Sequence, residues 1–292
     1  VCPLLVYIFV LAYQRLLMNQ HSSISVIITV KSRIEAFTAF VNRLEKAELP
    51  PRELIVVWMG RPSEHSLYKS EVFNIVHRFD NCEELDIAGA RNRGLAAATS
   101  SLCLFMNVES IFSPQLFKCL QNSWSQSRVI TSKISCVSED ISLTDYSDLI
   151  EHTNNNPETK ENGSDCAFSI RQNSTLFCIG TDDLKRIGGF DEGYRGYGLN
   201  DEDFFQTCIN ANLDIERIDL ITFIKERENY RCPVNHLIDF VSNAGRYKQK
   251  WGEYPCPEIL QDFADKGYIN QSFQKEELHI LRLPTQEEQY FK

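Results

Sequence analysis

The sequence predicts a single α/β domain in which helices flank a mixed, mainly parallel sheet. Three observations support this prediction: short β-branched runs alternate with segments of helical spacing, the chain has 292 residues, and 43% of them are hydrophobic whereas 24% are charged. Alternating strands and helices are typical of parallel sheets, because a helix returns the chain across the sheet before the next strand begins. A chain of this length can bury a large core within one domain.

The first half of the chain shows the clearest alternation. Short apolar and β-branched runs predict buried strands at residues 24–30, 53–59, 72–79 and 101–110. Apolar residues at helical spacing predict intervening helices at residues 33–47 and 86–99. Ligands of open α/β sheets bind beyond the carboxyl ends of the strands, so we expect the strand ends to converge on one crevice.

The second half begins with a polar, turn-rich stretch. Residues 138–165 show no sustained period, which indicates a mobile insertion or lid. An apolar strand is expected near residues 174–180, and helices are expected at residues 181–189, 201–213 and 236–252. Helical spacing in the second of these helices places four apolar residues on one face: Phe204, Phe205, Cys208 and Ile209. Gly188 and Gly252 are expected to end helices.

The composition excludes one class of partner and indicates a compartment. The formal net charge is −10 and the pI is near 5.2, so broad contact with nucleic acid, which requires clustered Lys and Arg, is not expected. The ten cysteines form no Cys-x-x-Cys pair. Scattered cysteines within apolar runs are typical of reduced thiols, which predicts a cytoplasmic protein.

Residues 1–22 begin with an apolar segment, VCPLLVYIFVLAY. This segment is shorter than the roughly 20 apolar residues that a membrane-spanning helix needs. We therefore expect a docking helix or an interfacial anchor, with peripheral membrane contact through residues 1–17. A signal or signal-anchor segment is the alternative.

Residues 188–205 have the most specialised composition in the chain. The stretch GGFDEGYRGYGLNDEDFF contains five glycines, two tyrosines and five acidic residues. Acidic residues in the first turn of a helix are favoured by the helix dipole, which is the structural explanation for this cluster. A flexible aromatic loop followed by carboxylates is equally suited to binding a polar substrate and accepting a proton from it.

Four segments in order carry a family resemblance: SVIITVKSR, PRELIVVWMG, AGARNRGLAAATSSLCLFMNVESIFSP and LKRIGGFDEGYRGYGLNDEDF. They resemble the family 2 glycosyltransferases with a GT-A fold, in particular the subgroup with a galactosyltransferase-like C-terminal domain. The resemblance runs from about Ile24 to Asp265. It implies a GT-A domain over residues 23–265, between the segment 1–22 and a C-terminal tail, 266–292. Within this domain we expect a nucleotide-binding half, a mobile insertion and an acceptor half, at residues 23–135, 136–170 and 171–265.

The resemblance implies an inverting transfer of a sugar in polysaccharide biosynthesis. The expected donor is a nucleotide diphosphate sugar, most simply a UDP-linked galactose or hexosamine, and the expected acceptor is a glycan, a lipid-linked glycan or another hydroxyl. By position in the family's Gly-aromatic-Gly-x-Glu-Asp pattern, Asp201 is the base, and Asn200 takes the place of the Glu. Acceptor or sugar contacts are expected at Tyr197, Gly198, Asn200 and Asp203.

A divalent cation, Mn²⁺ or Mg²⁺, is the expected cofactor. Residues two apart on a strand face the same side, so an Asp-x-Asp sequence can present two oxygens to one ion. This chain has Asn107 and Glu109 in those positions, which predicts weakened metal binding. Glu226 or Glu228 is a candidate third ligand where relatives have a His, whereas His236 fits a structural role better. In the alternative, Lys225 and Arg227 neutralise the diphosphate directly.

Donor binding is expected at the strand ends and at the start of the helix over residues 86–99. Positions that match the family are Thr29, Val30, Arg33, Trp58, Arg91 and Arg93. Trp58 is a candidate for stacking on the base, and burial in the core is the equally weighted alternative.

Two further classes of function stay open at this point. One is a non-catalytic relative that keeps a nucleotide pocket and acts as a binding or assembly partner, which the altered Asn107 and Asn200 motivate. The retained Asp201, Asp203 and Arg91 favour the enzyme. The other is a membrane-associated scaffold, which the N-terminal segment alone would support.

Overall fold

The computed structural model describes residues 23–31, 33–61, 67–80, 85–138, 145–155, 174–226 and 234–290. Four sequence-based predictions therefore lie wholly or partly outside the described residues: the N-terminal apolar segment 1–22, most of the insertion (residues 139–144 and 156–170), Arg227 and Glu228. In the described part of the chain, no helix combines the length and the apolar composition needed to cross a membrane.

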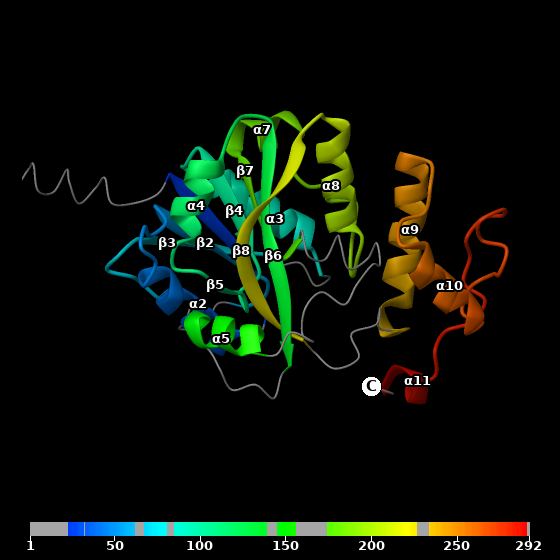
Figure 1. Ribbon diagram of the computed structural model, residues 1–292. Coiled ribbons are helices and arrows are strands. Elements are labelled where there is room, and N and C mark those ends of the chain that lie inside the picture. The colour runs from blue at the N-terminus through cyan, green and yellow to red at the C-terminus, as the bar shows by residue number, and fades with distance from the viewer. Residues whose placement is uncertain are drawn as a thin grey trace, which may run out of the picture.

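An eight-stranded sheet forms the centre of the molecule, with the strand order β3-β2-β1-β4-β7-β6-β8-β5 (Figure 1). The strands are β1 (Ile24–Val30), β2 (Glu53–Trp58), β3 (Asn74–Phe79), β4 (Leu102–Met106), β5 (Ile111–Phe112), β6 (Arg128–Ser138), β7 (Leu176–Gly180) and β8 (Asp214–Glu226). Strands β3, β2, β1 and β4 pair in parallel, as do β6 and β8. Strand β7 is antiparallel to both of its neighbours, and β5 is antiparallel to β8. The predicted mixed, mainly parallel sheet is confirmed.

The helices cover both faces of the sheet and extend beyond its edge. They are α2 (Ile34–Glu45), α3 (Ile87–Ala97), α4 (Leu116–Ser123), α5 (Tyr146–Asn155), α7 (Thr181–Arg186), α8 (Asn200–Asn210), α9 (Leu237–Trp251), α10 (Pro257–Asp265) and α11 (Gln286–Tyr290). Helices α2 and α4 pack on one face, and α3 and α8 pack on the other. Helix α9 lies beside α8, at the side of the molecule away from α2, and α10 packs on α9 (Figure 1).

The alternation of side chains along β1 explains the two layers. Val26, Ile28 and Val30 are buried against α2, whereas Ile27 is buried on the face that α3 covers. Helix α3 approaches this face closely because of Gly94, where an added Cβ would lie 2.5 Å from Ile27 Cγ2. Its first turn is capped by Asp86, whose Oδ1 accepts a hydrogen bond from the Gly89 amide at 2.9 Å.

The predicted strands and helices of the first half are confirmed, and so are the strand near 174–180 and the helices that begin near 181, 201 and 236. One part of the predicted turn-rich insertion is corrected, because residues 146–155 form α5, with Leu149 fully buried beside Phe223. One face assignment is wrong: Ile209 is 53% exposed, whereas the other three residues of its set are buried. Successive residues of a helix are rotated by about 100°, which places Ile209 outside the buried face of α8.

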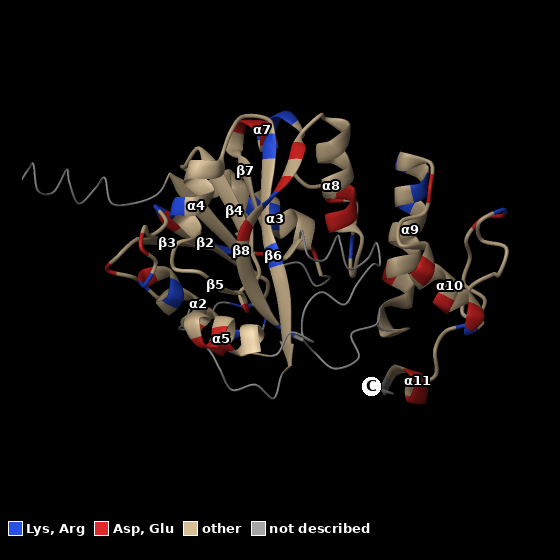
Figure 2. Ribbon diagram, viewed as in Figure 1, with Lys and Arg blue, Asp and Glu red and all other residues tan. Residues whose placement is uncertain are grey.

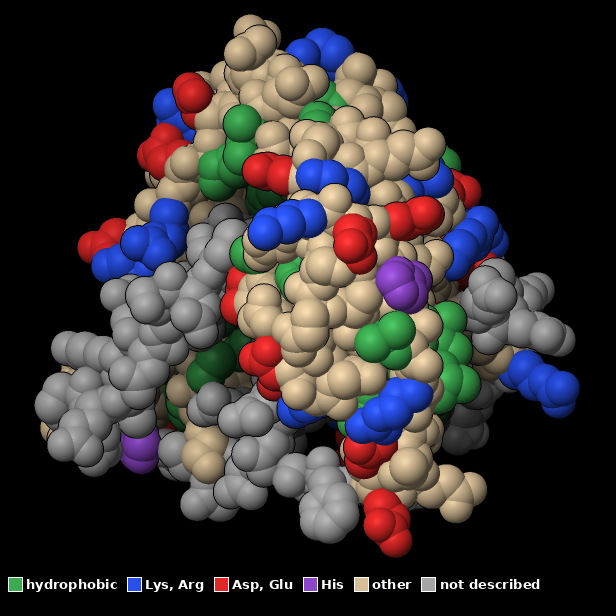
Figure 3. Space-filling view, turned by 90° about the vertical axis from the view of Figure 1, so that its right-hand side faces the viewer, with side chains coloured by type: hydrophobic (Ala, Val, Ile, Leu, Met, Phe, Trp, Pro, Cys, Tyr) green, Lys and Arg blue, Asp and Glu red, His purple; other side chains and the backbone are tan. Residues whose placement is uncertain are grey.

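The C-terminal helices build a third hydrophobic cluster. It joins buried side chains of α9 and α10 to three residues that follow them: Tyr268, Ile269 and Phe273. The first part of the expected C-terminal tail therefore packs onto the domain. Basic and acidic side chains are interspersed on this face of the molecule (Figure 3).

The described cysteines carry free thiols. Cys103, Cys178, Cys208 and Cys256 are buried, and Cys119 and Cys136 are partly exposed. Burial raises the pKa of the Cys103 thiol to about 11, so this thiol stays protonated at neutral pH.

Candidate active site

The ends of β1 and β4 meet through an ion pair. Arg33 follows β1, Glu109 follows β4, and Arg33 Nη1 lies 2.8 Å from Glu109 Oε1. The structure thus brings a predicted donor-binding residue to a predicted metal ligand. Both side chains remain partly exposed, so this pair lies at the surface of the carboxyl edge of the sheet.

The register of β1 and β2 separates the predicted donor residues onto two faces. Thr29 pairs with Val57, and Val30 pairs with Trp58. Val57 is buried on the α3 side, which places the half-buried Thr29 on the same side, toward the candidate site. Val30 and Trp58 are buried on the α2 side. Of the two consecutive residues, only Thr29 faces the layer that contains α3 and α8.

Trp58 is a core residue in this structure. Its side chain is 6% exposed, and the ring packs edge-on to Phe37 at a centroid distance of 5.0 Å. The indole Nε1 donates to His77 Nδ1 at 3.0 Å, and the Trp58 and His77 rings are stacked. The expected stacking of Trp58 on a base is therefore replaced by stacking within the protein, because strand alternation turns this side chain into the α2 layer.

Asn107 uses its side chain to shape the turn after β4. Asn107 Oδ1 accepts a hydrogen bond from the Glu109 amide at 2.9 Å, and the Asn107 carbonyl accepts one from the Ser110 amide at 3.0 Å. This is an Asx turn, which is a structural use of the amide group. With Glu109 paired to Arg33, the two residues as arranged do not fit a divalent cation.

The described part of the chain contains no cluster of potential metal ligands. Among residues that the structure describes, no group of three or more His, Cys, Asp or Glu side chains could hold a metal ion. Lys225, the predicted alternative cation, is exposed near the end of β8.

Arg91 and Asp201 form the central ion pair of the candidate site. Arg91 Nη1 of α3 donates to Asp201 Oδ1 in the first turn of α8, and both side chains are partly buried. The guanidinium also lies over the rings of Phe190 and Phe177, with centroid distances of 5.1 and 5.7 Å. Such cation–π contacts fix the orientation of the guanidinium. The structure thus joins the predicted base to a predicted donor residue from the other half of the chain.

Arg93 lies apart from this pair. Arg93 Nη1 donates to the Phe79 carbonyl at 2.8 Å, and Nη2 lies 3.6 Å from Asp80 Oδ1, at the end of β3. Two residues along a helix differ by roughly 200° in direction, so Arg91 and Arg93 cannot point to the same place. The structure therefore groups Arg91, but not Arg93, with Asp201.

The glycine-rich loop before α8 is built from left-handed backbone positions. Gly196 and Gly198 have φ values of +69° and +92°, and Leu199 has a φ of +68° although it is not a glycine. The Tyr197 ring between these positions is stacked on His236 at 4.5 Å. Asn200 follows at the start of α8, 8% exposed, and its buried Nδ2 finds no hydrogen-bond partner among the described residues.

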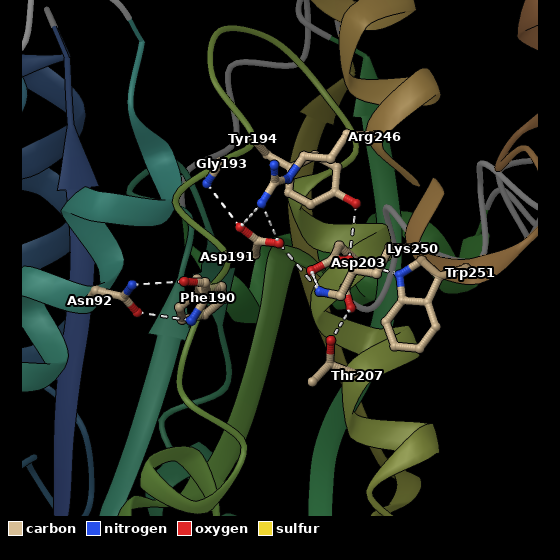
Figure 4. Close-up of polar contacts among 10 residues, drawn as sticks. All are labelled: Asn92, Phe190, Asp191, Gly193, Tyr194, Asp203, Thr207, Arg246, Lys250 and Trp251. Carbon is tan, nitrogen blue, oxygen red and sulfur yellow. Dashed lines mark hydrogen bonds and ion pairs between the residues drawn. The ribbon is translucent and has the colours of Figure 1, made fainter. Parts of the chain in front are cut away.

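Asp203 has the opposite character to Asp201. Its side chain is 2% exposed, and its carboxylate accepts hydrogen bonds from Tyr194, Lys250 and Trp251 at distances of 2.8 to 3.0 Å (Figure 4). Lys250 and Trp251 belong to α9, so this carboxylate fixes α9 on α8. The predicted contact between Asp203 and an acceptor would require these donors to be displaced.

Asp191 is the second carboxylate that basic side chains of α9 contact (Figure 4). Arg246 Nη2 contacts its two oxygens at 2.7 and 3.0 Å, and the Gly193 amide donates to Oδ1 at 2.9 Å. Burial alone would raise the pKa of Asp191, but the Gly193 amide and the charges of Arg246 and Lys250 together hold this pKa below its usual value. Burial and the charge of Asp203 raise the pKa of the neighbouring Tyr194, which therefore remains a donor.

Acidic residues occupy the first turn of α8, and the neighbouring helix α9 carries basic residues (Figure 2). The α9 residues of this contact were not predicted as functional. Arg246 and Lys250 are four residues apart, a spacing that places two charges on one helix face. That spacing is the signal that identifies a charged face, although the sequence does not show which carboxylates it meets.

Comparisons with known proteins agree with this architecture. A family model described as the N-terminal domain of galactosyltransferase matches residues 164–230, which include the glycine-rich loop and α8. The structure of TarS from S. aureus in complex with UDP-GlcNAc superposes with a TM-score of 0.53 at 16% identity, and covers 83% of this chain and 70% of that chain. The chain has a GT-A fold.

Two further solved structures are similar to this GT-A chain. Mannosyltransferase PcManGT from Pyrobaculum calidifontis, in complex with GDP-Man and Mn²⁺, has a TM-score of 0.50 at 12% identity, with 84% of this chain and 70% of that chain covered. The catalytic domain of Drosophila β1,4-galactosyltransferase 7, in complex with xylobiose, has a TM-score of 0.43 at 13% identity and covers 66% of this chain. The match spans 63% of the Drosophila chain. The family match thus covers the segment that holds the glycine-rich loop and α8, and the similarity to solved structures shows the fold.

Proposed function

We propose that this GT-A chain transfers a sugar from a nucleotide diphosphate donor to a hydroxyl group of an acceptor. The observation that carries the proposal is the Arg91–Asp201 pair. Its carboxylate, Asp201, directly follows the glycine-rich loop and lies within the matched galactosyltransferase segment. A carboxylate that is partly exposed, oriented by a guanidinium and adjacent to an aromatic loop has the properties of a general base in a sugar site.

The proposed reaction is a single displacement with inversion. Asp201 accepts the proton of the acceptor hydroxyl while that oxygen forms a bond to the anomeric carbon of the donor sugar. The bond between the anomeric carbon and the diphosphate oxygen breaks, and the nucleoside diphosphate leaves with the electron pair. Arg91 holds the Asp201 carboxylate in position before the acceptor binds.

The donor is proposed to bind along the carboxyl edge, at Thr29, Arg33 and Arg91. We expect a UDP-linked sugar, because the matched segment is of the galactosyltransferase type. Asn107 and Glu109 do not fit a divalent cation as arranged, so the diphosphate charge is assigned to cationic side chains, with Arg33 and Lys225 as the described candidates.

The acceptor is proposed to meet the loop of Tyr197 and Gly198. The Tyr197 ring is partly exposed and stacked on His236, and an aromatic ring of this kind is a surface on which a sugar can pack. The unpaired Nδ2 of Asn200 is a donor for an acceptor oxygen. We propose a glycan or lipid-linked glycan as acceptor, in cytoplasmic polysaccharide biosynthesis.

Nucleotide release tests this proposal. The purified chain is incubated with UDP-galactose, UDP-N-acetylglucosamine or GDP-mannose, each with a panel of oligosaccharide acceptors. The released nucleoside diphosphate, UDP or GDP, is then measured. The expected result is UDP release that depends on an acceptor, with inverted anomeric configuration in the product by NMR. A folded chain that releases no nucleotide with any pair would contradict the proposal.

A second candidate is a non-catalytic GT-A relative that binds a nucleotide sugar as an assembly partner. The observation in its favour is that Asn107 forms a turn and Glu109 forms an ion pair, at the positions where the family resemblance implies a metal site. The two candidates separate in one experiment, because this relative would bind the donor without releasing nucleotide in the presence of any acceptor.

A further inference from the structure

The glycine-rich loop is held by one face of α9. Asn243 is 3% exposed, and its Nδ2 donates to the backbone carbonyls of Arg195 at 2.9 Å, Gly198 at 2.9 Å and Tyr197 at 3.3 Å. One buried amide group thus contacts three carbonyl groups within four residues of the loop backbone. Buried carbonyl groups are costly to leave unpaired, so these contacts fix the path of the loop.

Asp239 supports the same loop one helical turn earlier. Asp239 Oδ2 accepts a hydrogen bond from the Tyr197 amide at 3.1 Å. Because residues four apart lie on the same face of a helix, Asp239 and Asn243 approach the loop together. The loop is built for this close approach: a Cβ added to Gly196 would lie 2.3 Å from Asp239, and one added to Gly198 would lie 3.1 Å from the Phe240 ring.

The loop is also tied to the opposite side of the site. Arg195 donates to Asp86, the residue that caps α3, and the Gly196 amide donates to the Leu85 carbonyl at 2.9 Å. Leu199 then turns the chain into α8 through its left-handed backbone. Any shift of residues 195–198 therefore displaces Tyr197 and, through this turn, Asp201.

From these contacts we infer that Asn243 and Asp239 are positioning residues for the Tyr197 loop and for Asp201. The second half of α9 carries Arg246, Lys250 and Trp251, which anchor the helix to Asp191 and Asp203 (Figure 4). Because α9 is anchored to Asp191 and Asp203, it holds the loop in a fixed position relative to these two carboxylates. The link to Asp201 rests on the proposed sugar transfer, whereas the link to the loop stands on the contacts alone.

Hydrogen exchange of the full chain measures the structural part of this inference. In Asn243→Ala, the amides of residues 195–201 should exchange about 10-fold faster or more, while those of β4 and β7 stay protected. Asp239→Ala, at a half-buried position, serves if the first variant does not fold, and should accelerate exchange of the Tyr197 amide. Ser242→Ala, exposed on the same helix, is the control and should match the wild type.

Kinetics measures the positioning part. In Asn243→Ala the turnover of sugar transfer should fall about 10-fold or more, because a small misplacement of reacting groups is costly. The affinity for UDP should stay within about twofold of the wild type, since the loop contacts described above do not involve Thr29 or Arg33, the proposed donor residues at the end of β1. Asp239→Asn keeps an acceptor for the Tyr197 amide and should restore most of the turnover that Asp239→Ala loses.

Each outcome separates the two claims. Unchanged exchange at residues 195–201 in both alanine variants would overturn the inference whatever the activity. Faster exchange with normal turnover would overturn the positioning role while leaving sugar transfer intact. Faster exchange in a chain whose wild type transfers no sugar would support the hold on the loop and overturn the proposed function.

Discussion

Arg91 of α3 donates a hydrogen bond to Asp201 of α8, two residues that are 110 positions apart in the sequence. The contact closes the candidate site between the half of the chain that follows β1 and the half that follows the glycine-rich loop. It depends on the packing of both helices on the same sheet face, through Ala88 and Ala90 of α3 and Phe204 of α8. The position of Asp201 relative to Arg91 is thus set by the way α3 and α8 pack on one face of the sheet.

Replacement of Asp201 by Asn should abolish sugar transfer without unfolding the chain. General base catalysis contributes roughly 10²- to 10⁴-fold, so turnover should fall by about this factor. Asp201 is partly exposed, and thermal unfolding should therefore change little. Asp182→Asn, at an exposed position of α7, is the matched control. Normal turnover in Asp201→Asn would exclude this residue as the base.

Replacement of Asp203 by Asn should destabilise the chain instead. The variant leaves Lys250, Tyr194 and Trp251 facing a weaker acceptor, and hydrogen bonds to a buried charged group contribute about 1.5–3 kcal/mol. Chemical unfolding measures the free energy of unfolding, with Asp182→Asn again as control. A fully stable variant with impaired acceptor binding would restore the predicted acceptor role of Asp203.

Asp191 should make the stability of the chain sensitive to acid. Its folded pKa is lowered, so its contribution is fully present above its unfolded pKa and is lost as the pH falls through the folded value. Asp191→Asn should therefore cost about 1–2 kcal/mol near neutral pH. The difference in the free energy of unfolding between the wild type and Asp191→Asn should shrink as the pH falls below 3.8, the ordinary pKa of an Asp side chain. A difference that stays constant between pH 7 and pH 3 would contradict this account.

Glu109→Gln should leave nucleotide binding nearly intact in the presence of EDTA. Exposed ion pairs contribute about 0–1 kcal/mol, so the affinity for UDP, measured by calorimetry, should change by about fivefold at most. Glu216→Gln, which breaks the exposed pair with Arg128, is the control. UDP binding that needs Mn²⁺ and disappears in Glu109→Gln would instead identify Glu109 as a metal ligand.

Two glycine substitutions separate backbone strain from steric conflict. Gly188 and Gly196 both have positive φ, but an added Cβ at Gly188 meets nothing within 4 Å, whereas one at Gly196 would overlap Asp239. Gly188→Ala should cost about 1 kcal/mol from the left-handed backbone alone. Gly196→Ala should cost clearly more and should also slow sugar transfer. If both substitutions lower the free energy of unfolding equally, Asp239 of α9 must move away from the added methyl group at no cost in stability.

The alternating sheet could be predicted from its sequence because its strands are continuous apolar runs. Strands β6 and β8 escaped prediction because polar side chains are buried within them. Ser132 and Thr222 are almost fully buried and share a hydrogen bond of 2.7 Å between their hydroxyl groups. A pair of this kind has no signature in either strand alone, since each hydroxyl is satisfied by a residue about 90 positions away.

The candidate site could be predicted in part. The sequence assigned Asp201 as the base and Asp203 as an acceptor contact, but it did not show that only Asp201 stays accessible, because both residues lie in the first turn of α8. Only the position of Lys250 and Trp251 on α9 decides that Asp203 is the buried one. Thr29 and Val30 were predicted together, although strand alternation alone allows only one of them to face the site.

Thermal unfolding with nucleotides tests the central claim most directly. The purified chain is heated with UDP, GDP and their common sugars, each with Mn²⁺ or with EDTA. A ligand at about 100 times its dissociation constant stabilises the folded state by about 2.7 kcal/mol, which is a readily measured shift. The account predicts a higher unfolding temperature with UDP and UDP-sugars, already present in EDTA. No shift with any nucleotide, in a sample that unfolds cooperatively, would contradict a donor site at the carboxyl edge of this sheet.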